Sequence, residues 1–246
     1  MSVIITSNQP RHKEFARRIC ESIDIDLVIF EEKSKRPDPS LYEKEKIFFK
    51  KSVDWIPSCN FFQVENGLIN SKRIKEIIQE SSPDVIFVFG SSILKPRIFE
   101  IARVGCVNIH TGIVQFLRGV DSTFWAIHDE IPYAIGATVH FIDKGIDTGK
   151  IISQTRPELD LKDSVESIFL KVCQSGFDTL CENLDKITSG NTEGYMPEAK
   201  GKLYQTSDMS DEAILRVENS YQSTLDSYLK RKDFFDKRFK IIDGKD

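Results

Sequence analysis

An amide, an imidazole and a carboxylate occur in this chain in an order that suits chemistry at a carbonyl group. Asn108 and His110 are separated by one residue, and Asp147 follows in the glycine-bounded run 145–149. An amide donates a hydrogen bond to a carbonyl oxygen, and an imidazole stabilises or protonates the oxyanion that forms on attack. A carboxylate orients the imidazole and raises its pKa. These three groups are suited to acyl transfer without a covalent enzyme intermediate.

Two predicted strands would bring these groups to one edge of a sheet. Residues 85–90 form a continuous apolar run, which is typical of a parallel strand covered on both faces. Residues 105–110 read as a second strand whose end is polar, and ligands of open α/β sheets bind beyond the carboxyl ends of strands. Asp147 is favoured over Asp143 as the carboxylate, because it precedes Thr148-Gly149, a tight turn that can point a side chain into a cleft.

The wider pattern alternates strands and helices, so the sequence predicts an α/β fold with a Rossmann-like, mostly parallel sheet. Strands are expected at residues 3–6, 26–30, 85–90, 105–110 and 136–143, and another begins at 150. Helices are expected at residues 42–51, 69–81, 96–102, 122–129 and 160–185, and near Phe15. We expect a catalytic domain over 1–185 and a short C-terminal appendage over 186–246, made of a hairpin at 201–207 and charged helices after Asp211.

Composition narrows the classes of function. The 246 residues carry a net charge of −4, which argues against a strong general attraction to nucleic acid. No apolar run approaches the ~20 residues needed to cross a bilayer, and the N-terminus lacks the features of a signal peptide. The five cysteines form neither a CxxC pair nor a zinc pattern. We therefore expect a cytoplasmic protein with reduced core thiols and no metal.

Five motifs between Val85 and Gln154 carry a family resemblance. They are residues 88–90 (Val-Phe-Gly), 108–110 (Asn-Ile-His), 117–119 (Leu-Arg-Gly), 135–140 (Ile-Gly-Ala-Thr-Val-His) and 145–149 (Gly-Ile-Asp-Thr-Gly). In this order and spacing they resemble the formyltransferases that use 10-formyltetrahydrofolate. That family includes glycinamide ribonucleotide transformylase, methionyl-tRNA formyltransferase and the sugar-nucleotide N-formyltransferases. The resemblance implies 10-formyltetrahydrofolate as co-substrate and Asn108, His110 and Asp147 as the catalytic trio.

The resemblance also implies binding residues. Two loops would hold the pterin, and the residues predicted there are Phe89, Gly90, Ser91, Ile93, Leu94, His140, Ile142 and Asp143. Arg118 and Gly119 would contact the acceptor, because a loop beside the trio is where an acceptor would enter; the alternative is an ordinary turn. Asn8 and Arg11 at a helix start would bind an anion, and the alternative is capping by Asn8 with Pro10 in the first turn. His12 is interpreted as a surface cap.

The chain departs from the family in ways that concern the acceptor. Thr111-Gly112 replaces the usual Pro-Ser, and the first strand leads to residues 7–12 instead of a glycine-rich phosphate loop. The tail after Lys186 is short and balanced in charge, unlike that of a methionyl-tRNA enzyme. The amine of a nucleotide-linked amino deoxysugar is therefore the first choice of acceptor. Two other acceptors remain open, glycinamide ribonucleotide and methionyl-tRNA. The protein could also hydrolyse formyltetrahydrofolate to formate, or be a non-catalytic relative that binds folate or another protein. A homodimer is possible.

Overall fold

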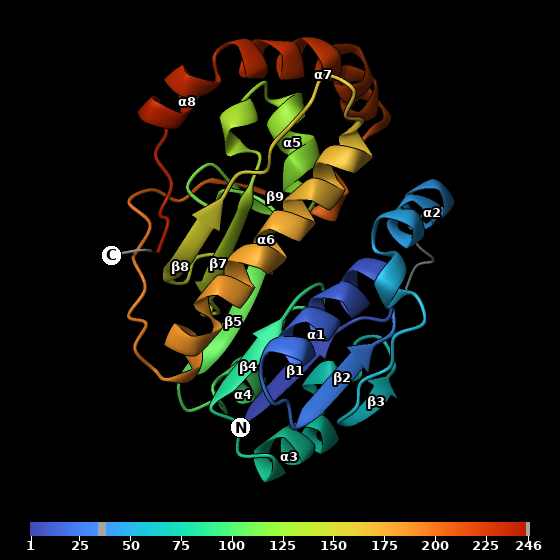
Figure 1. Cartoon of the computed structure of the whole chain (residues 1–246), viewed down its shortest axis with the longest axis vertical. Coiled ribbons are helices and arrows are strands. Elements are labelled where there is room, and N and C mark those ends of the chain that lie inside the picture. The colour runs from blue at the N-terminus through green and yellow to red at the C-terminus, as the bar shows by residue number, and fades with distance from the viewer. Residues whose placement is uncertain (34–37, 245–246) are drawn as a thin grey trace. The chain divides into compact units, whose positions relative to one another are not determined.

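The computed structural model describes residues 1–33 and 38–244 and divides them into two compact units. The first unit comprises residues 1–33, 38–109, 141–144 and 180–193. The second comprises residues 110–140, 145–179 and 194–244. The helices and strands of both units are labelled in Figure 1.

The first unit is built on parallel strands in the order β3-β2-β1-β4-β5. Val3 of β1 lies opposite Leu27 of β2 and Ile86 of β4, and the register continues from there. All five residues of β1 and of β2 are buried, as expected for strands covered on both faces. The strands are β1 (Ser2–Thr6), β2 (Leu27–Glu31), β3 (Asn60–Val64), β4 (Val85–Val88) and β5 (Gly105–His110).

Helices cover both faces of this sheet (Figure 1). Phe15 and Ile19 of α1 are buried, whereas Ile74 and Ile78 of α3 join Ile98 of α4 in a core cluster with alternate residues of the strands. Alternation along each strand therefore supplies a separate apolar layer to each face. The helices are α1 (Pro10–Ser22), α2 (Pro39–Phe48), α3 (Lys72–Glu80) and α4 (Pro96–Phe99), with short 3-10 segments at Lys50–Ser52 and Leu68–Asn70.

The second unit contains two pairs of strands and a helical layer. β7 (Ala137–Phe141) and β8 (Ile151–Thr155) are antiparallel, with a bulge after Val139, whereas β6 (Leu117–Gly119) and β9 (Lys202–Tyr204) are parallel. His110, the last residue of β5, also belongs to this unit. Its helices are α5 (Ser122–His128), α7 (Asp211–Lys230), α8 (Lys232–Arg238) and the part of α6 (Val165–Thr188) up to Thr179, whereas the rest of α6 belongs to the first unit. Short 3-10 segments lie at Pro132–Ala134 and Thr206–Asp208.

The fold class predicted from the sequence is confirmed, and most elements form within a few residues of the expected bounds. The predicted hairpin at 201–207 is wrong, because β9 pairs with β6, far away in the sequence. Gly201 permits this approach, since a Cβ there would lie 2.4 Å from the carbonyl carbon of Phe116. β3 was not predicted; its side chains are partly exposed, as befits an edge strand, so it lacks a strong apolar signal.

The start of α1 also differs from expectation. The N-cap of the helix is Gln9, not Asn8, and Pro10 occupies the first turn as predicted. His12 is 1% exposed, so its interpretation as a surface cap is wrong. No helix in the described part of the chain has the length and apolar character that a membrane span requires. The five cysteines, all of which the structure describes, form no disulfide, and Cys106 and Cys173 are buried.

Candidate active site

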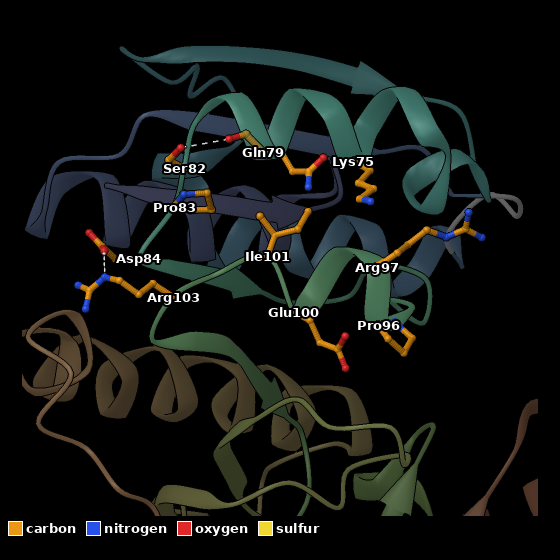
Figure 2. A pocket seen from close by; sticks show the side chains of 10 residues that line it. All are labelled: Lys75, Gln79, Ser82, Pro83, Asp84, Pro96, Arg97, Glu100, Ile101 and Arg103. Carbon is orange, nitrogen blue, oxygen red and sulfur yellow. Dashed lines mark hydrogen bonds and ion pairs between the residues drawn. The ribbon is translucent and has the colours of Figure 1, made fainter.

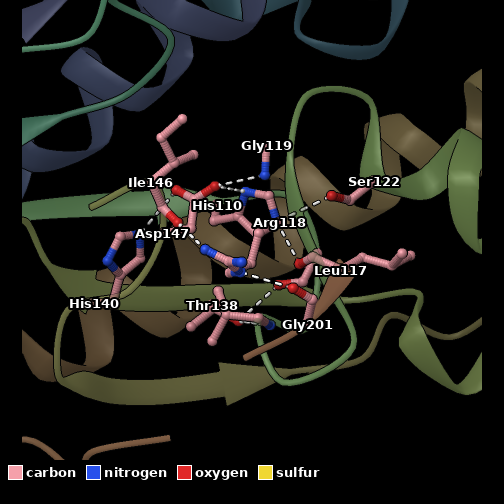
Figure 3. A network of polar contacts seen from close by, with 12 residues as sticks. His110, Leu117, Arg118, Gly119, Ser122, Thr138, His140, Ile146, Asp147 and Gly201 are labelled. Atoms are coloured by element: carbon pink, nitrogen blue, oxygen red, sulfur yellow. Dashed lines mark hydrogen bonds and ion pairs between the residues drawn. The ribbon is translucent and has the colours of Figure 1, made fainter. Parts of the chain in front are cut away.

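A buried histidine–aspartate pair lies in the second unit. His110 ends β5 and is 5% exposed, and its Nδ1 lies 3.2 Å from Oδ2 of Asp147 (Figure 3). Asp147 follows β7 in a turn and has a φ of 50°, in the left-handed region that aspartate tolerates better than most residues. The turn is tight, since a Cβ at Gly145 would lie 2.0 Å from Oγ1 of Thr148. The turn chemistry used to favour Asp147 over Asp143 therefore places the carboxylate on the imidazole.

Two further groups hold the carboxylate. The backbone N–H of Gly119 donates to Oδ2 of Asp147 over 2.8 Å, and Nε2 of His140 lies 3.5 Å from Oδ1. The bulge between Val139 and His140 changes the register of β7 at this point. Bulges re-aim side chains next to active sites, which accounts for a strand histidine that faces Asp147 (Figure 3).

The other nitrogen of the His110 ring is also enclosed. Its Nε2 lies 3.1 Å from the carbonyl oxygen of Leu117 and 3.0 Å from Oγ of Ser122. A Cβ at Gly112 would lie 2.6 Å from the same nitrogen, so only glycine fits there. Both edges of the imidazole are therefore fixed by the fold.

Arg118 and the C-terminal strand brace this arrangement. Nε of Arg118 donates to the carbonyl of Gly201 over 2.8 Å, and its NH1 donates to the carbonyl of Ile146 over 3.0 Å. Gly119 has a φ of 91°, and a Cβ there would lie 2.0 Å from the carbonyl oxygen of Tyr204. β9 thus supports the segment that supplies both the Gly119 N–H and the Leu117 carbonyl.

The electrostatics favour an ionised aspartate beside a neutral ring. Burial would raise the pKa of Asp147, but His110, His140 and the Gly119 N–H together hold this pKa well below its usual range. Burial lowers the pKa of His110, and His140 and Arg118 add to this effect, whereas Asp147 opposes it. The carboxylate thus raises the pKa of the imidazole as expected, but burial lowers this pKa by more, so the net pKa of His110 lies below its usual value.

The remaining residues predicted for the site lie partly in the first unit. Asn108 is half-buried in β5, paired in register with Val88. Arg11 forms an ion pair with the buried Glu45, and Asn8 is exposed just before α1. The predicted pterin residues of this unit are Phe89 and Leu94, which are buried, Gly90, Ser91 and Ile142, which are half-buried, and Ile93 and Asp143, which are exposed.

Residues 89–94 form a loop in which only some backbone groups form hydrogen bonds within the protein. The carbonyl of Phe89 accepts from Thr6, and that of Ile93 accepts from Asn70. Gly90 has a φ of 67°, and a Cβ there would lie 2.1 Å from Nε2 of His12. Within the described residues, the N–H groups of Ile93 and Leu94 donate to no protein acceptor. The loop therefore keeps backbone donors that a ligand can use.

A surface groove of about 610 Å³ lies elsewhere in the first unit (Figure 2). It involves residues that precede β4 and β5, such as Asp84 and Arg103, whose side chains pair at 2.7 Å. The groove is therefore at the amino ends of these strands, whereas α/β ligand sites form at the carboxyl ends. In the chain from 1–33 and 38–244, no cluster of His, Cys, Asp or Glu is arranged to hold a metal ion.

Three contributors to the site were not predicted from the sequence. Leu117 and Gly201 act through backbone carbonyls, which carry no residue signature. Ser122 was read only as a helix start, and α5 does begin there. Its hydroxyl could be assigned to His110 only once the turn between residues 112 and 121 was known.

The fold and this buried pair define a class of α/β proteins with acid–base groups at the end of a central parallel strand. The sequence model of the formyl transferase family matches residues 2–184, and the chain belongs to that family. A methionyl-tRNA formyltransferase of Chlorobium chlorochromatii is 29% identical over 123 residues, which are 50% of this chain and 39% of that relative. The match thus spans less than half the length of this curated relative.

Solved structures show the same fold across most of the chain. A sugar N-formyltransferase from a Shewanella species has a TM-score of 0.63 and 18% identity, covering 88% of this chain and 86% of that one. The formyltransferase PseJ from Anoxybacillus kamchatkensis, in complex with UDP-4,6-dideoxy-4-formamido-L-AltNAc and tetrahydrofolate, has a TM-score of 0.54 and 19% identity. The match covers 85% of this chain and 87% of the PseJ chain.

Proposed function

We propose that the protein transfers a formyl group from 10-formyltetrahydrofolate to a primary amine. The observation that carries this proposal is the His110–Asp147 pair, 3.2 Å apart and enclosed at the end of a parallel strand, in a chain of the formyl transferase family. A neutral imidazole beside an ionised carboxylate can accept a positive charge without moving. That capacity is what attack by an amine on a formyl carbon requires.

Each group then has a defined role. Asn108 donates to the formyl oxygen as it becomes anionic, and removal of one such donor in other enzymes costs ~2.7–4 kcal/mol of barrier. The positive charge of a protonated His110 stabilises the same oxygen electrostatically. Asp147 holds His110 and helps to take the proton that the attacking amine loses. The folate supplies the formyl group on N10. The backbone N–H groups of Ile93 and Leu94 are suited to hold its pterin, since they are without protein acceptors among the described residues.

The proposed acceptor is the amine of a nucleotide-linked amino deoxysugar. Solved sugar N-formyltransferases share the fold over 88% of this chain, including much of the tail beyond residue 184. In the second unit that tail supplies β9, which braces Arg118 and Gly119. This shared fold with proteins named for sugar acceptors supports the proposed acceptor.

A panel of acceptors tests this proposal. Purified protein is incubated with 10-formyltetrahydrofolate and, separately, UDP- and dTDP-linked amino sugars, glycinamide ribonucleotide, methionyl-tRNA or no amine. Mass spectrometry should detect a gain of one formyl group on an amino sugar. Transfer to methionyl-tRNA alone would show that tRNA, and not a sugar nucleotide, is the acceptor. This outcome is a real alternative because relatives of the chain are named methionyl-tRNA formyltransferase. Formate release at the same rate without any amine would indicate a hydrolase.

Arg11 offers a sharper test of where the acceptor's phosphates bind. Arg11→Ala should raise the KM for the sugar nucleotide and leave folate binding unchanged, because a lost phosphate contact weakens ground-state binding. Glu45→Gln is the matched control, since it breaks the same ion pair but keeps the guanidinium. Equal rises in KM for both variants would assign Arg11 a structural role instead.

A further inference from the structure

The hydroxyl of Ser122 occupies an unusual position beside His110. Nε2 of the ring faces two oxygens, the Leu117 carbonyl at 3.1 Å and Ser122 Oγ at 3.0 Å. A carbonyl oxygen can only accept, whereas a hydroxyl can donate or accept. Ser122 is 1% exposed, so water does not readily take its place.

The charge of Asp147 decides which tautomer the neutral ring adopts. If the proton were on Nε2, the lone pair of Nδ1 would face an ionised carboxylate 3.2 Å away. The proton of the neutral ring therefore lies on Nδ1 and is donated to Asp147. Nε2 then carries a lone pair, and Ser122 is the neighbour that can donate to it.

The protonated ring has a different requirement. It carries a hydrogen on each nitrogen, so Nδ1 donates to Asp147 and Nε2 donates to the Leu117 carbonyl. The Ser122 hydroxyl must then turn its own hydrogen away and accept. We propose that Ser122 is a positioning residue whose hydroxyl turns with the charge of His110, donating to Nε2 of the neutral ring and accepting from it when the ring is protonated.

This arrangement lets the ring gain or lose a proton without moving. The enclosing atoms of Gly112, Leu117 and Ser122 stay in place, and only a hydroxyl hydrogen reorients. Such preorganisation lowers the reorganisation needed as charge develops. The catalytic meaning rests on the proposed function, whereas the contact itself can be tested without any substrate.

The alternative role for this contact is nucleophilic. Ser122, His110 and Asp147 are connected in the manner of a Ser–His–Asp triad. However, Ser122 is buried, and a Cβ at Gly112 would lie 2.6 Å from its Cβ, so the hydroxyl has little room to receive an acyl group. The geometry favours positioning over attack.

Titration of His110 by NMR provides the test. Ser122→Ala should raise the pKa of His110 by about half a unit to one unit, because the neutral ring loses its donor while the protonated ring keeps the Leu117 carbonyl. Asp147, His140 and Arg118 also act on this ring, and they stay unchanged in the variant. The chain has four histidines, so a His110→Gln sample identifies the resonance.

Two further variants control the experiment. Thr123→Val removes a neighbouring buried hydroxyl that has no hydrogen-bond partner among the described residues, and the pKa of His110 should not change. Ser122→Thr restores a hydroxyl and should return the pKa towards the wild-type value. The pH at which kcat changes should move with the NMR titration.

Three results would overturn the proposal. The first is an unchanged or lowered pKa of His110 in Ser122→Ala. The second is an equal rise in Thr123→Val. The third is a formyl group found on Ser122 by peptide mass spectrometry, because the hydroxyl would then be the nucleophile. A failure of formyl transfer in the acceptor panel would leave the titration result standing, so the two proposals can fail separately.

Discussion

Each unit contains a buried histidine, and the two rings differ in role because their neighbouring charges differ. His12 is 1% exposed and His110 is 5% exposed. Burial lowers the pKa of both, but the charges near His12 are the cations Arg11 and Lys33, which lower it further. The charge nearest His110 is Asp147, which opposes the effect of burial. His12 is therefore held neutral, whereas His110 is neutral but poised to accept a proton.

Hydrogen bonding separates the two rings as clearly as charge does. Nδ1 of His12 has no partner among the described residues, and the ring packs against Phe89 and Gly90. Both nitrogens of His110 have partners. A buried ring with a missing partner is a packing element, whereas a buried ring with an acceptor at each nitrogen is equipped for proton transfer.

The largest effect is expected from removing the carboxylate. Asp147→Asn should lower kcat by ~10³–10⁴-fold while the fold is retained, as for the buried aspartate of a Ser–His–Asp triad, since the ring loses the group that fixes its tautomer. Asp163→Asn is the control, because Asp163 is another aspartate of the second unit that is largely buried and hydrogen-bonded. Rates are measured with a saturating amine acceptor. A loss of less than threefold in Asp147→Asn would make the pair structural and remove the contrast with His12.

The next effect concerns stability and the packing role of His12. Gly90→Ala should lower the free energy of unfolding by ~2–4 kcal/mol, because the φ of 67° disfavours a side chain and the new Cβ would strike Nε2 of His12 at 2.1 Å. Gly67→Ala is the matched control, with a φ of 81° and no atom within 4 Å of its Cβ. It should cost only ~1–2 kcal/mol. Equal losses in urea denaturation would show that His12 yields and does not support the loop.

Much of the first unit could be predicted from the sequence, but less of the second. The runs 3–6, 26–30 and 85–90 are apolar throughout, so burial on both faces can be predicted from composition alone. Asn108, His110 and Asp147 were identified through motifs that lie at strand ends and turns. The Leu117 carbonyl, the Gly119 N–H and β9 could not be predicted, because backbone groups supply those contacts and a non-local pairing positions them.

The prediction that His12 lies at the surface was wrong for a related reason. A polar residue near a helix start usually lies at the surface, and nothing in residues 7–12 signals that Phe89 and Gly90 will close over it. Because burial also lowers the pKa of His12, the effect of this residue on stability can be measured by changing the pH. A lower pKa in the folded state means that the unfolded chain binds more protons as the pH falls below about 6.5.

A smaller effect therefore follows from lowering the pH. The free energy of unfolding should be unaffected by His12 above about pH 6.5, and should decrease below it by up to ~1.4 kcal/mol per pH unit, until the pH reaches the folded-state pKa. His12→Leu should reduce this slope and leave the part that His110 contributes, since burial lowers the pKa of His110 as well. His128→Leu, at a partly exposed histidine, is the control for losing one ring. An unchanged slope in His12→Leu would assign the acid sensitivity to other groups.

The smallest effect is expected at Arg118, which tests whether a cation near His110 matters as cations near His12 do. Arg118 lowers the pKa of His110 and donates to the carbonyls of Gly201 and Ile146. Arg118→Met keeps the length of the side chain, so it should raise the pKa of His110 slightly and lower kcat about three- to tenfold as the Asp147 turn loosens. Arg156→Met is the matched control, because Arg156 also donates to two carbonyls of the second unit, those of Tyr133 and Phe239. The control should lose stability without changing the His110 titration. If Arg118→Met altered only the KM for the acceptor, Arg118 would be a substrate contact, and the brace formed by β9 would have no part in positioning Asp147.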